Sequence, residues 1–127
     1  MSKQGSPRPS GLDEEAITRL EAGLPQGSLN TLLRLFADEL GRRSTVVDRL
    51  LANGDLAELG AVAHSLQGSA ATYGAPGLAS AAAELGKQVA SGNPAGVTGA
   101  AHQLVAEVTS VRDELERRLG SSMGDKP

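Results

Sequence analysis

Residues 55–74 read DLAELGAVAHSLQGSAATYG, and this spacing predicts an amphipathic helix. The apolar side chains recur at three- and four-residue steps, so they share one side of a helix. They are Leu56, Leu59, Val62, Ala63, Leu66, Ala70 and Tyr73. Asp55 and Glu58 form a capping-box pattern at the start, and Gly74 closes the segment. The stretch is therefore predicted to pack on other helices through Leu and Ala.

His64 lies well away from that apolar stripe, among small or uncharged helical neighbours. The residues three and four positions from it are Gly60, Ala61, Gln67 and Gly68, and Ala71 lies one turn further along the same side. A solvated helix face ordinarily carries Lys, Glu or Arg, whereas each glycine in a helix interior costs about 1 kcal/mol. Two interpretations explain the glycines: they leave the imidazole open to another macromolecule, or they let a neighbouring helix pack closely beside an ordinary surface histidine.

Two helices are predicted before this segment. A short one, residues 13–22, is expected to pack across the others as a lid through Ile17 and Leu20. A long one begins near Ser28 and ends at residues 53–54, and Gly41 is expected to bend or loosen it. Its predicted inward residues are Leu29, Leu32, Leu33, Phe36, Leu40, Val47, Leu50 and Leu51.

Two more helices follow, each opened by a proline, which suits a first helical turn. Pro76 starts a helix that ends near Gly92, with an apolar stripe of Leu78, Ala82, Leu85 and Val89. Pro94 starts the last helix, whose seam approaches a heptad pattern. That seam consists of Val97, Ala101, Leu104, Val108, Val111, Leu115 and Leu119.

Four long amphipathic helices with short connections predict an all-α fold, an up-down-up-down antiparallel four-helix bundle with a short N-terminal accessory helix. Aromatic residues make up 2% of the chain, so the core is expected to consist of Leu, Val and Ala and to form a rigid platform. Residues 12–120 are assigned to the bundle, 1–11 to a disordered segment and 121–127 to a flexible tail. The polar ends favour a free-standing protein.

Composition excludes several classes of function. The 127 residues carry a formal net charge of −3, and the two signs are interspersed without a basic stripe. Nucleic acid is therefore not expected as a partner. No apolar run approaches the ~18 residues that span a bilayer, and no signal peptide is evident, so a cytoplasmic protein without membrane contact is expected. There is no cysteine and no local ligand cluster, so no metal site is predicted. We expect a monomer.

The segment AHSLQGSAATYGAPGLASAAAELG, residues 63–86, resembles the signature of histidine-containing phosphotransfer domains. The matching positions are Ala63, His64, Leu66, Gly68, Ser69, Ala70, Gly74 and Leu78. Outside the signature the likeness is one of pattern and length, over about residues 12–119. One position departs from the family: Gln67 stands where the usual lysine is found.

The resemblance implies a phosphorelay protein that accepts a phosphoryl group on His64 from a receiver-domain aspartate and passes it to another. The implied partners are receiver domains of response regulators or hybrid histidine kinases, which bring their own Mg²⁺. The chain itself is then not an enzyme: no cofactor, ATP site or hydrolytic site is expected. Gln67 and Gly68 take the phosphoryl-stabilising positions, and the docking surface is expected at Gly60, Ala61, Gln67, Gly68 and Ala71.

Two alternatives stay open. A bundle that binds receivers without transferring phosphate is favoured by Gln67, which lacks the lysine charge. The phosphoacceptor helix pair of a sensor kinase is disfavoured by Ser65, where such kinases place an acid, and by the lack of a nucleotide-binding segment. His102 is interpreted as a surface residue and Tyr73 as a partly buried core edge.

Overall fold

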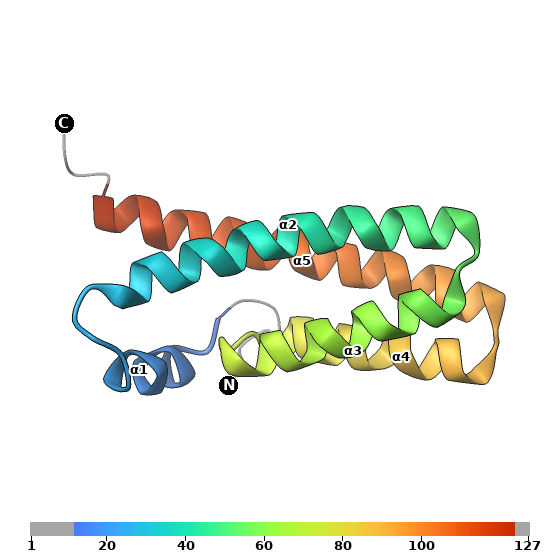
Figure 1. Ribbon diagram of the computed structural model, residues 1–127, viewed down its shortest axis with the longest axis horizontal. Coiled ribbons are helices and arrows are strands. Elements are labelled where there is room, and N and C mark those ends of the chain that lie inside the picture. Colours follow the sequence, from blue (N-terminus) through green and yellow to red (C-terminus); the bar gives the residue numbers. More distant parts are fainter. Residues whose placement is uncertain (1–11, 124–127) are drawn as a thin grey trace, which may run out of the picture.

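The computed structural model describes residues 12–123, with side chains as far as residue 120, and in this range the chain is helical without strands (Figure 1). The helices are α1 (Glu14–Ala22), α2 (Ser28–Asn53), α3 (Leu56–Thr72), α4 (Pro76–Ser91) and α5 (Pro94–Met123). Helices α2 to α5 run alternately in opposite directions, and each packs on the next, with α5 returning to α2 (Figure 1). The predicted antiparallel bundle with an N-terminal helix is confirmed.

The helix ends follow the local signals in the sequence. Asp55 caps α3 by accepting a hydrogen bond from the backbone N–H of Glu58 at 3.3 Å. Pro76 and Pro94 are the first residues of α4 and α5. Gly92 ends α4 in the left-handed conformation, with φ of 72°, which glycine adopts without steric cost. These caps confirm the predicted boundaries of α3 and α4.

At the other boundaries, α5 continues to Met123, past the limit of 120 expected for the bundle. One glycine in a helix costs about 1 kcal/mol, so Gly120 does not have to end it. Residues 1–11 and 124–127, for which disorder was expected, lie outside the described range. Within that range no helix combines the length and the apolar character that a membrane span requires.

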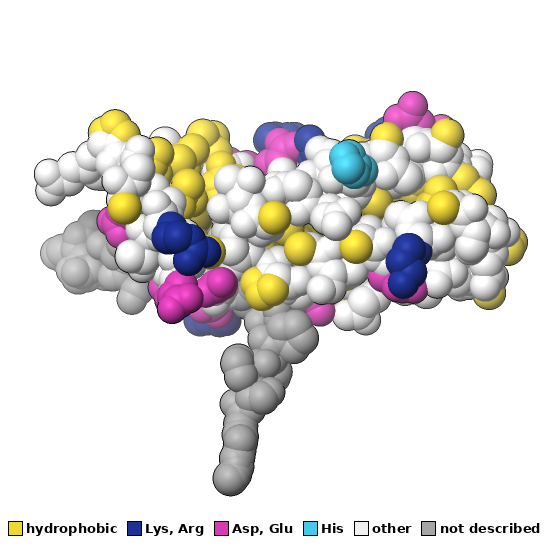
Figure 2. Space-filling model, turned by 90° about the horizontal axis from the view of Figure 1, so that it is seen from below, with side chains coloured by type: hydrophobic (Ala, Val, Ile, Leu, Met, Phe, Trp, Pro, Cys, Tyr) yellow, Lys and Arg dark blue, Asp and Glu magenta, His cyan; other side chains and the backbone are white. Residues whose placement is uncertain are grey.

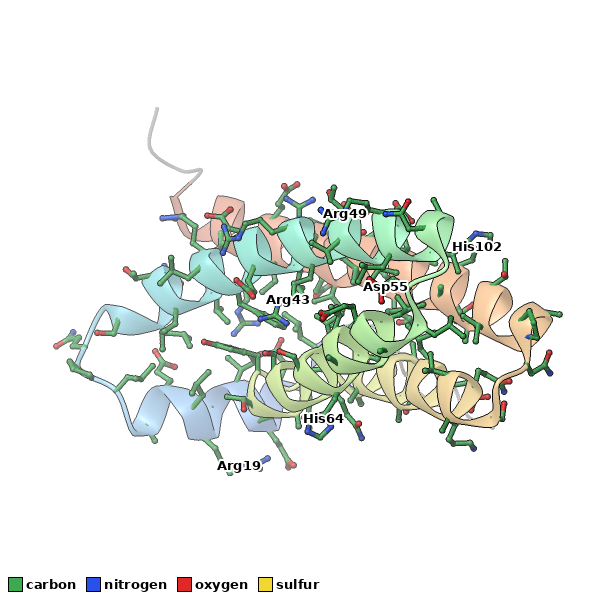
Figure 3. The ribbon with its side chains drawn as sticks, turned by 45° about the vertical axis from the view of Figure 1, so that its right-hand side comes forward. Arg19, Arg43, Arg49, Asp55, His64 and His102 are labelled. Carbon is green, nitrogen blue, oxygen red and sulfur yellow. The ribbon has the colours of Figure 1, made fainter. Side chains whose placement is uncertain are left out.

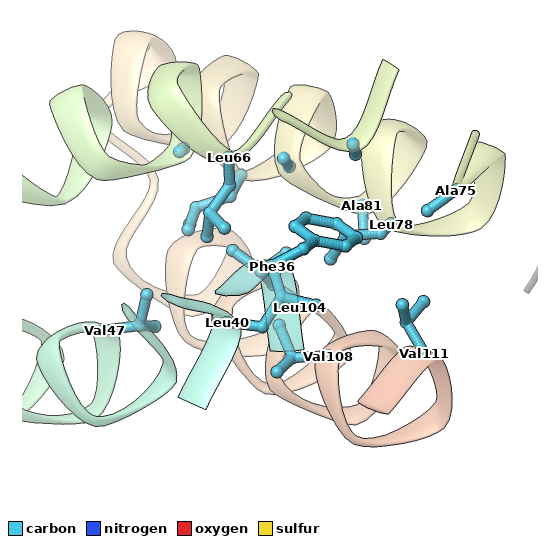
Figure 4. Close-up of a cluster of buried hydrophobic side chains, with 14 of the residues drawn as sticks. Phe36, Leu40, Val47, Leu66, Ala75, Leu78, Ala81, Leu104, Val108 and Val111 are labelled. Carbon is cyan, nitrogen blue, oxygen red and sulfur yellow. The ribbon is translucent and has the colours of Figure 1, made fainter. Parts of the chain in front are cut away.

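The core is built almost entirely from Leu, Val and Ala, and it includes no polar or charged residue of the described chain. Phe36 lies between the helix layers, close to Leu66, Leu78 and Leu104 (Figure 4). All seven predicted seam residues of α5 are buried. Among the other predicted inward residues, Leu32, Leu51 and Val89 are only partly buried, as are Leu56, Val62 and Tyr73 of α3.

Helix α1 lies at the end of the bundle where two of the four long helices extend further than the other two. With 26 and 30 residues, α2 and α5 are about 39 and 45 Å long, whereas α3 and α4 are about 25 Å. The longer pair therefore extends past the α3–α4 turn, and α1 lies there (Figure 1). Ile17 is 1% exposed, which confirms the predicted lid. Arg118 on α5 forms an ion pair with Glu14 at 2.6 Å, which links α1 to α5 as well.

The α3–α4 turn is shaped to receive α1. Gly74 has φ of 72°, and its carbonyl oxygen accepts a hydrogen bond from the Asp13 N–H at 2.6 Å. A Cβ at Gly74 would lie 2.6 Å from the Cβ of Ala16, closer than real contacts allow. Glycine here therefore ends α3 and also lets α1 approach the bundle.

Gly41 serves a purpose that the sequence does not reveal. The guanidinium of Arg112 lies over it, 3.1 Å from where a Cβ would be, and Arg112 Nε donates to the Ala37 carbonyl at 3.1 Å. Gly41 thus gives an arginine of α5 access to the backbone of α2.

Candidate functional site

His64 lies near the middle of α3 and projects away from the bundle into solvent (Figure 3). Its neighbours Ala63 and Leu66 are completely buried against the other helices. Since these two residues fix the rotation of α3 about its axis, the imidazole is held on the outer side. A side chain on such a rigid element loses little freedom when a partner docks, which favours reactions that depend on positioning.

The exposed residues near His64 include most of the predicted docking surface. Ala61, Gln67, Gly68 and Ala71 are all exposed on the same side of α3. A Cβ at Gly68 would meet nothing within 4 Å, so this glycine leaves open space one turn from the imidazole. In Figure 2 the histidine in view borders uncharged groups, with basic and acidic side chains a short distance to its left. This arrangement agrees with the interpretation that the imidazole is left accessible.

Gly60 differs from the other predicted docking residues. It is partly buried, and a Cβ there would lie 3.4 Å from Cγ1 of Val89 on α4. Its contact is therefore with the neighbouring helix, which is the packing interpretation of the two glycines. Each interpretation thus describes one of them: Gly60 admits α4, and Gly68 leaves space in front of His64.

On the flank of α3 that faces α2, side chains cross between the helices. Nη1 of Arg43 donates to Oγ of Ser65 at 2.5 Å, directly beside His64 in the chain. Arg43 also pairs with Glu39, as does Arg42 at 2.7 Å. The hydrogen bond from Arg43, and secondarily that from Arg42, lowers the pKa of Glu39. This network restrains the segment that carries the histidine, and sequence reasoning missed it because no local pattern links residues 43 and 65.

Tyr73 closes the same flank. Its ring stacks on Phe36 of α2, with centroids 4.3 Å apart and planes at 14°. A groove of about 260 Å³ runs beside the pair and is bordered by Ser69 and Arg42. Tyr73 is partly buried, so its interpretation as a core edge is confirmed.

The face around His64 has little charge of its own. Helix α3 contains no Lys or Arg, and Gln67 supplies only an uncharged amide that can donate hydrogen bonds. The other histidine, His102, is exposed on α5, as predicted. Among the residues that the structure describes, no three His, Cys, Asp or Glu side chains come together as metal ligands.

This arrangement suits a nucleophile that depends on another molecule. A neutral imidazole has a free lone pair on one ring nitrogen and can attack a phosphoryl group in line. The α3 face offers no carboxylate cluster for Mg²⁺ and no Gly-rich phosphate loop, which phosphoryl transfer ordinarily requires. Helix α3 thus presents a candidate nucleophile without groups that bind phosphate or Mg²⁺.

The model of a protein family described as "Hpt domain" matches the chain over residues 31–118. The matched segment is more than half of the 127 residues and contains all of α3 and α4, with His64 at its interior. Comparison with curated proteins and with solved structures finds no match.

Proposed function

Because the chain belongs to the histidine-containing phosphotransfer (Hpt) domain family, we propose that His64 is the residue that carries the phosphoryl group. Domains of this family act in phosphorelays as phosphoryl carriers rather than as catalysts, and their partners are receiver domains. The observation that supports His64 is its exposure on a rigid helix beside the open space at Gly68.

The transfer can be written with the groups that each protein supplies. A neutral ring nitrogen of His64 attacks the phosphorus of a receiver's phospho-aspartate, the P–O bond to the aspartate breaks, and the carboxylate leaves. The phosphohistidine then passes the group to an aspartate of a second receiver by the reverse reaction. Mg²⁺ held by the receiver supplies charge neutralisation. We propose that this chain contributes no cofactor, no ATP site and no hydrolytic site.

Gly68 and Gln67 are proposed to contact the phosphoryl group. Gly68 leaves room for it, and the Gln67 amide donates hydrogen bonds without the charge of the usual lysine. Phosphohistidine is then less stabilised here than with a lysine. Gln67→Lys is expected to shift the equilibrium toward the phosphorylated chain, measured as the fraction of label shared with a receiver. Identical equilibria and rates would contradict this role.

The test is incubation with a panel of receiver domains phosphorylated by acetyl phosphate, followed by detection of acid-labile, alkali-stable phosphate. The wild type and His102→Gln are expected to become labelled, and His64→Gln to remain unlabelled. His102→Gln is a matched control because it removes the other exposed histidine. Label on His64→Gln would contradict the assignment of the site.

A second candidate is a domain that binds receivers without transfer, and Gln67 is the observation that favours it. Binding without label in the wild type would support it. Within either candidate, Ala71→Glu is expected to weaken receiver binding while the fold is kept, because Ala71 is exposed on the His64 face. A monomeric state and a cytoplasmic location stay predictions, the first testable by light scattering.

A further inference from the structure

A groove separates α1 from the end of α3 and the start of α4, on the side of the molecule that carries His64. Its volume is about 390 Å³. Arg19 borders it on α1, Ala71 on α3 and Ala79 on α4. Because Ala71 belongs both to this groove and to the exposed face of His64, the groove continues that face toward α1.

A docked receiver is large enough to reach this groove. Ala71 follows His64 by seven residues, which places it about 10.5 Å along α3. A stable interface covers about 800 Å² on each partner, equivalent to a disc about 16 Å in radius. A receiver centred on His64 therefore extends past Ala71 and over the α1 side of the groove.

On the α1 side of the groove, Arg19 is the cation available to a docked receiver. It is exposed, and the described chain gives it neither an ion pair nor a hydrogen bond, even though Glu15 precedes it by one turn. Other cations on neighbouring helices are engaged: Lys87 pairs with Glu84 at 3.4 Å, and Arg43 with Glu39. Arg19 and His64 project from the same side of the molecule (Figure 3).

We propose that α1 forms part of the receiver-docking surface and that Arg19 binds an acidic group of the receiver at the edge of this groove. The inference rests on the proposed transfer function and assigns a docking residue to it. A receiver's transfer site is anionic, because it contains the phospho-aspartate and the carboxylates that hold Mg²⁺. Helix α3 has no Lys or Arg with which to attract it, so Arg19 supplies that attraction from α1.

The experiment measures the transfer rate against the concentration of the receiver that labels the wild type fastest. Arg19→Glu is expected to raise the KM for phosphorylated receiver about three- to tenfold at low salt, with kcat unchanged, because charges at an interface rim act mainly on association. The difference from wild type should shrink as salt is added. Arg49→Glu is the matched control: Arg49 is also exposed, and it lies on α2 on the opposite side in Figure 3.

A structural role of Arg19 is separated by two further measurements. Arg19 lies in the last turn of α1, where a positive charge also favours the helix, so Arg19→Glu can loosen α1. Arg19→Lys keeps the charge and should keep the wild-type KM, and melting curves report the fold of each variant. An unchanged KM in Arg19→Glu, or an equal rise in Arg49→Glu, would overturn the docking role while transfer persists. Absence of label on the wild type would overturn the proposed function and this inference together.

Discussion

On the flank of α3 that faces α4, the contact depends on the absence of a side chain: Gly60 has none, and it lies against Val89. On the flank that faces α2, long side chains cross the interface, with Arg43 bound to Ser65 and Tyr73 stacked on Phe36. The first contact depends on shape and the second on polar and aromatic groups. His64 is thus held by two kinds of interaction, whose removal has different consequences.

Between the two flanks lies the open face with Gly68, and of the substitutions that leave His64 in place, Gly68→Leu is expected to have the largest effect on transfer. A Cβ there meets nothing within 4 Å, and leucine favours a helix over glycine by about 1 kcal/mol, so stability should be kept or raised. The added side chain occupies the space proposed for the phosphoryl group, and transfer should fall about 100-fold, or about 2.7 kcal/mol. Transfer assays quenched at successive times measure the rate, and thermal melts measure the stability.

Gly99→Leu is the control for this substitution, because Gly99 is also an exposed helical glycine with nothing within 4 Å, but on α5. It should gain similar stability and transfer at the wild-type rate. Wild-type transfer in Gly68→Leu would show that the open space at Gly68 has no functional role.

Gly60→Leu tests the flank that packs on α4, and it should lower stability while transfer is kept. The new side chain must displace Val89, since a Cβ alone already comes within 3.4 Å of it. Overpacking of this kind costs about 1–3 kcal/mol, which denaturant unfolding can measure. The folded fraction should still accept phosphate on His64. A fully stable Gly60→Leu with poor transfer would instead assign Gly60 to the docking surface.

The α4 flank could largely be foreseen from the sequence. Helix ends are local events, so Asp55, Pro76 and Gly92 were sufficient to locate them. The apolar stripes follow from helical periodicity, and the lid position of α1 followed from Ile17. Periodicity alone did not name the helix that Gly60 faces: Gly60 and Gly68 point about 80° apart, on either side of His64, and the position of Val89 places Gly60 against α4.

The α2 flank could not be foreseen, because its contacts join residues that are distant in the sequence. Arg43 and Ser65 are each unremarkable in their own helices, and their bond depends on how α2 and α3 align. The same holds for Arg112 over Gly41: the sequence predicted that this glycine bends or loosens the helix, and it gave no sign that an arginine of α5 lies over it. Long polar side chains have too many possible partners for spacing alone to select one.

Arg43→Ala tests whether the α2 flank restrains α3. Removing the guanidinium deletes the bond to Ser65 and the pair with Glu39, and it should cost about 1 kcal/mol because the group is partly exposed. Arg42→Ala is a matched control: Arg42 pairs with the same Glu39, is 68% exposed and makes no bond to α3. Equal losses in the two variants would mean that the bond to Ser65 adds nothing.

The smallest expected effect is the pH dependence contributed by Glu39. The Arg43 hydrogen bond, with that of Arg42, lowers the pKa of Glu39 in the folded chain, so the folded state favours the carboxylate. Stability from this group is therefore complete above its ordinary pKa and is lost as the pH falls through the lowered value. At neutral pH, Glu39→Gln should cost about 0.5 kcal/mol, and the difference from wild type should vanish in acid. In Arg43→Ala the same substitution should cost less still, because the stronger of the two hydrogen bonds is already gone; an unchanged cost would place the stabilisation in Arg42 and remove Glu39 from the link between α2 and α3.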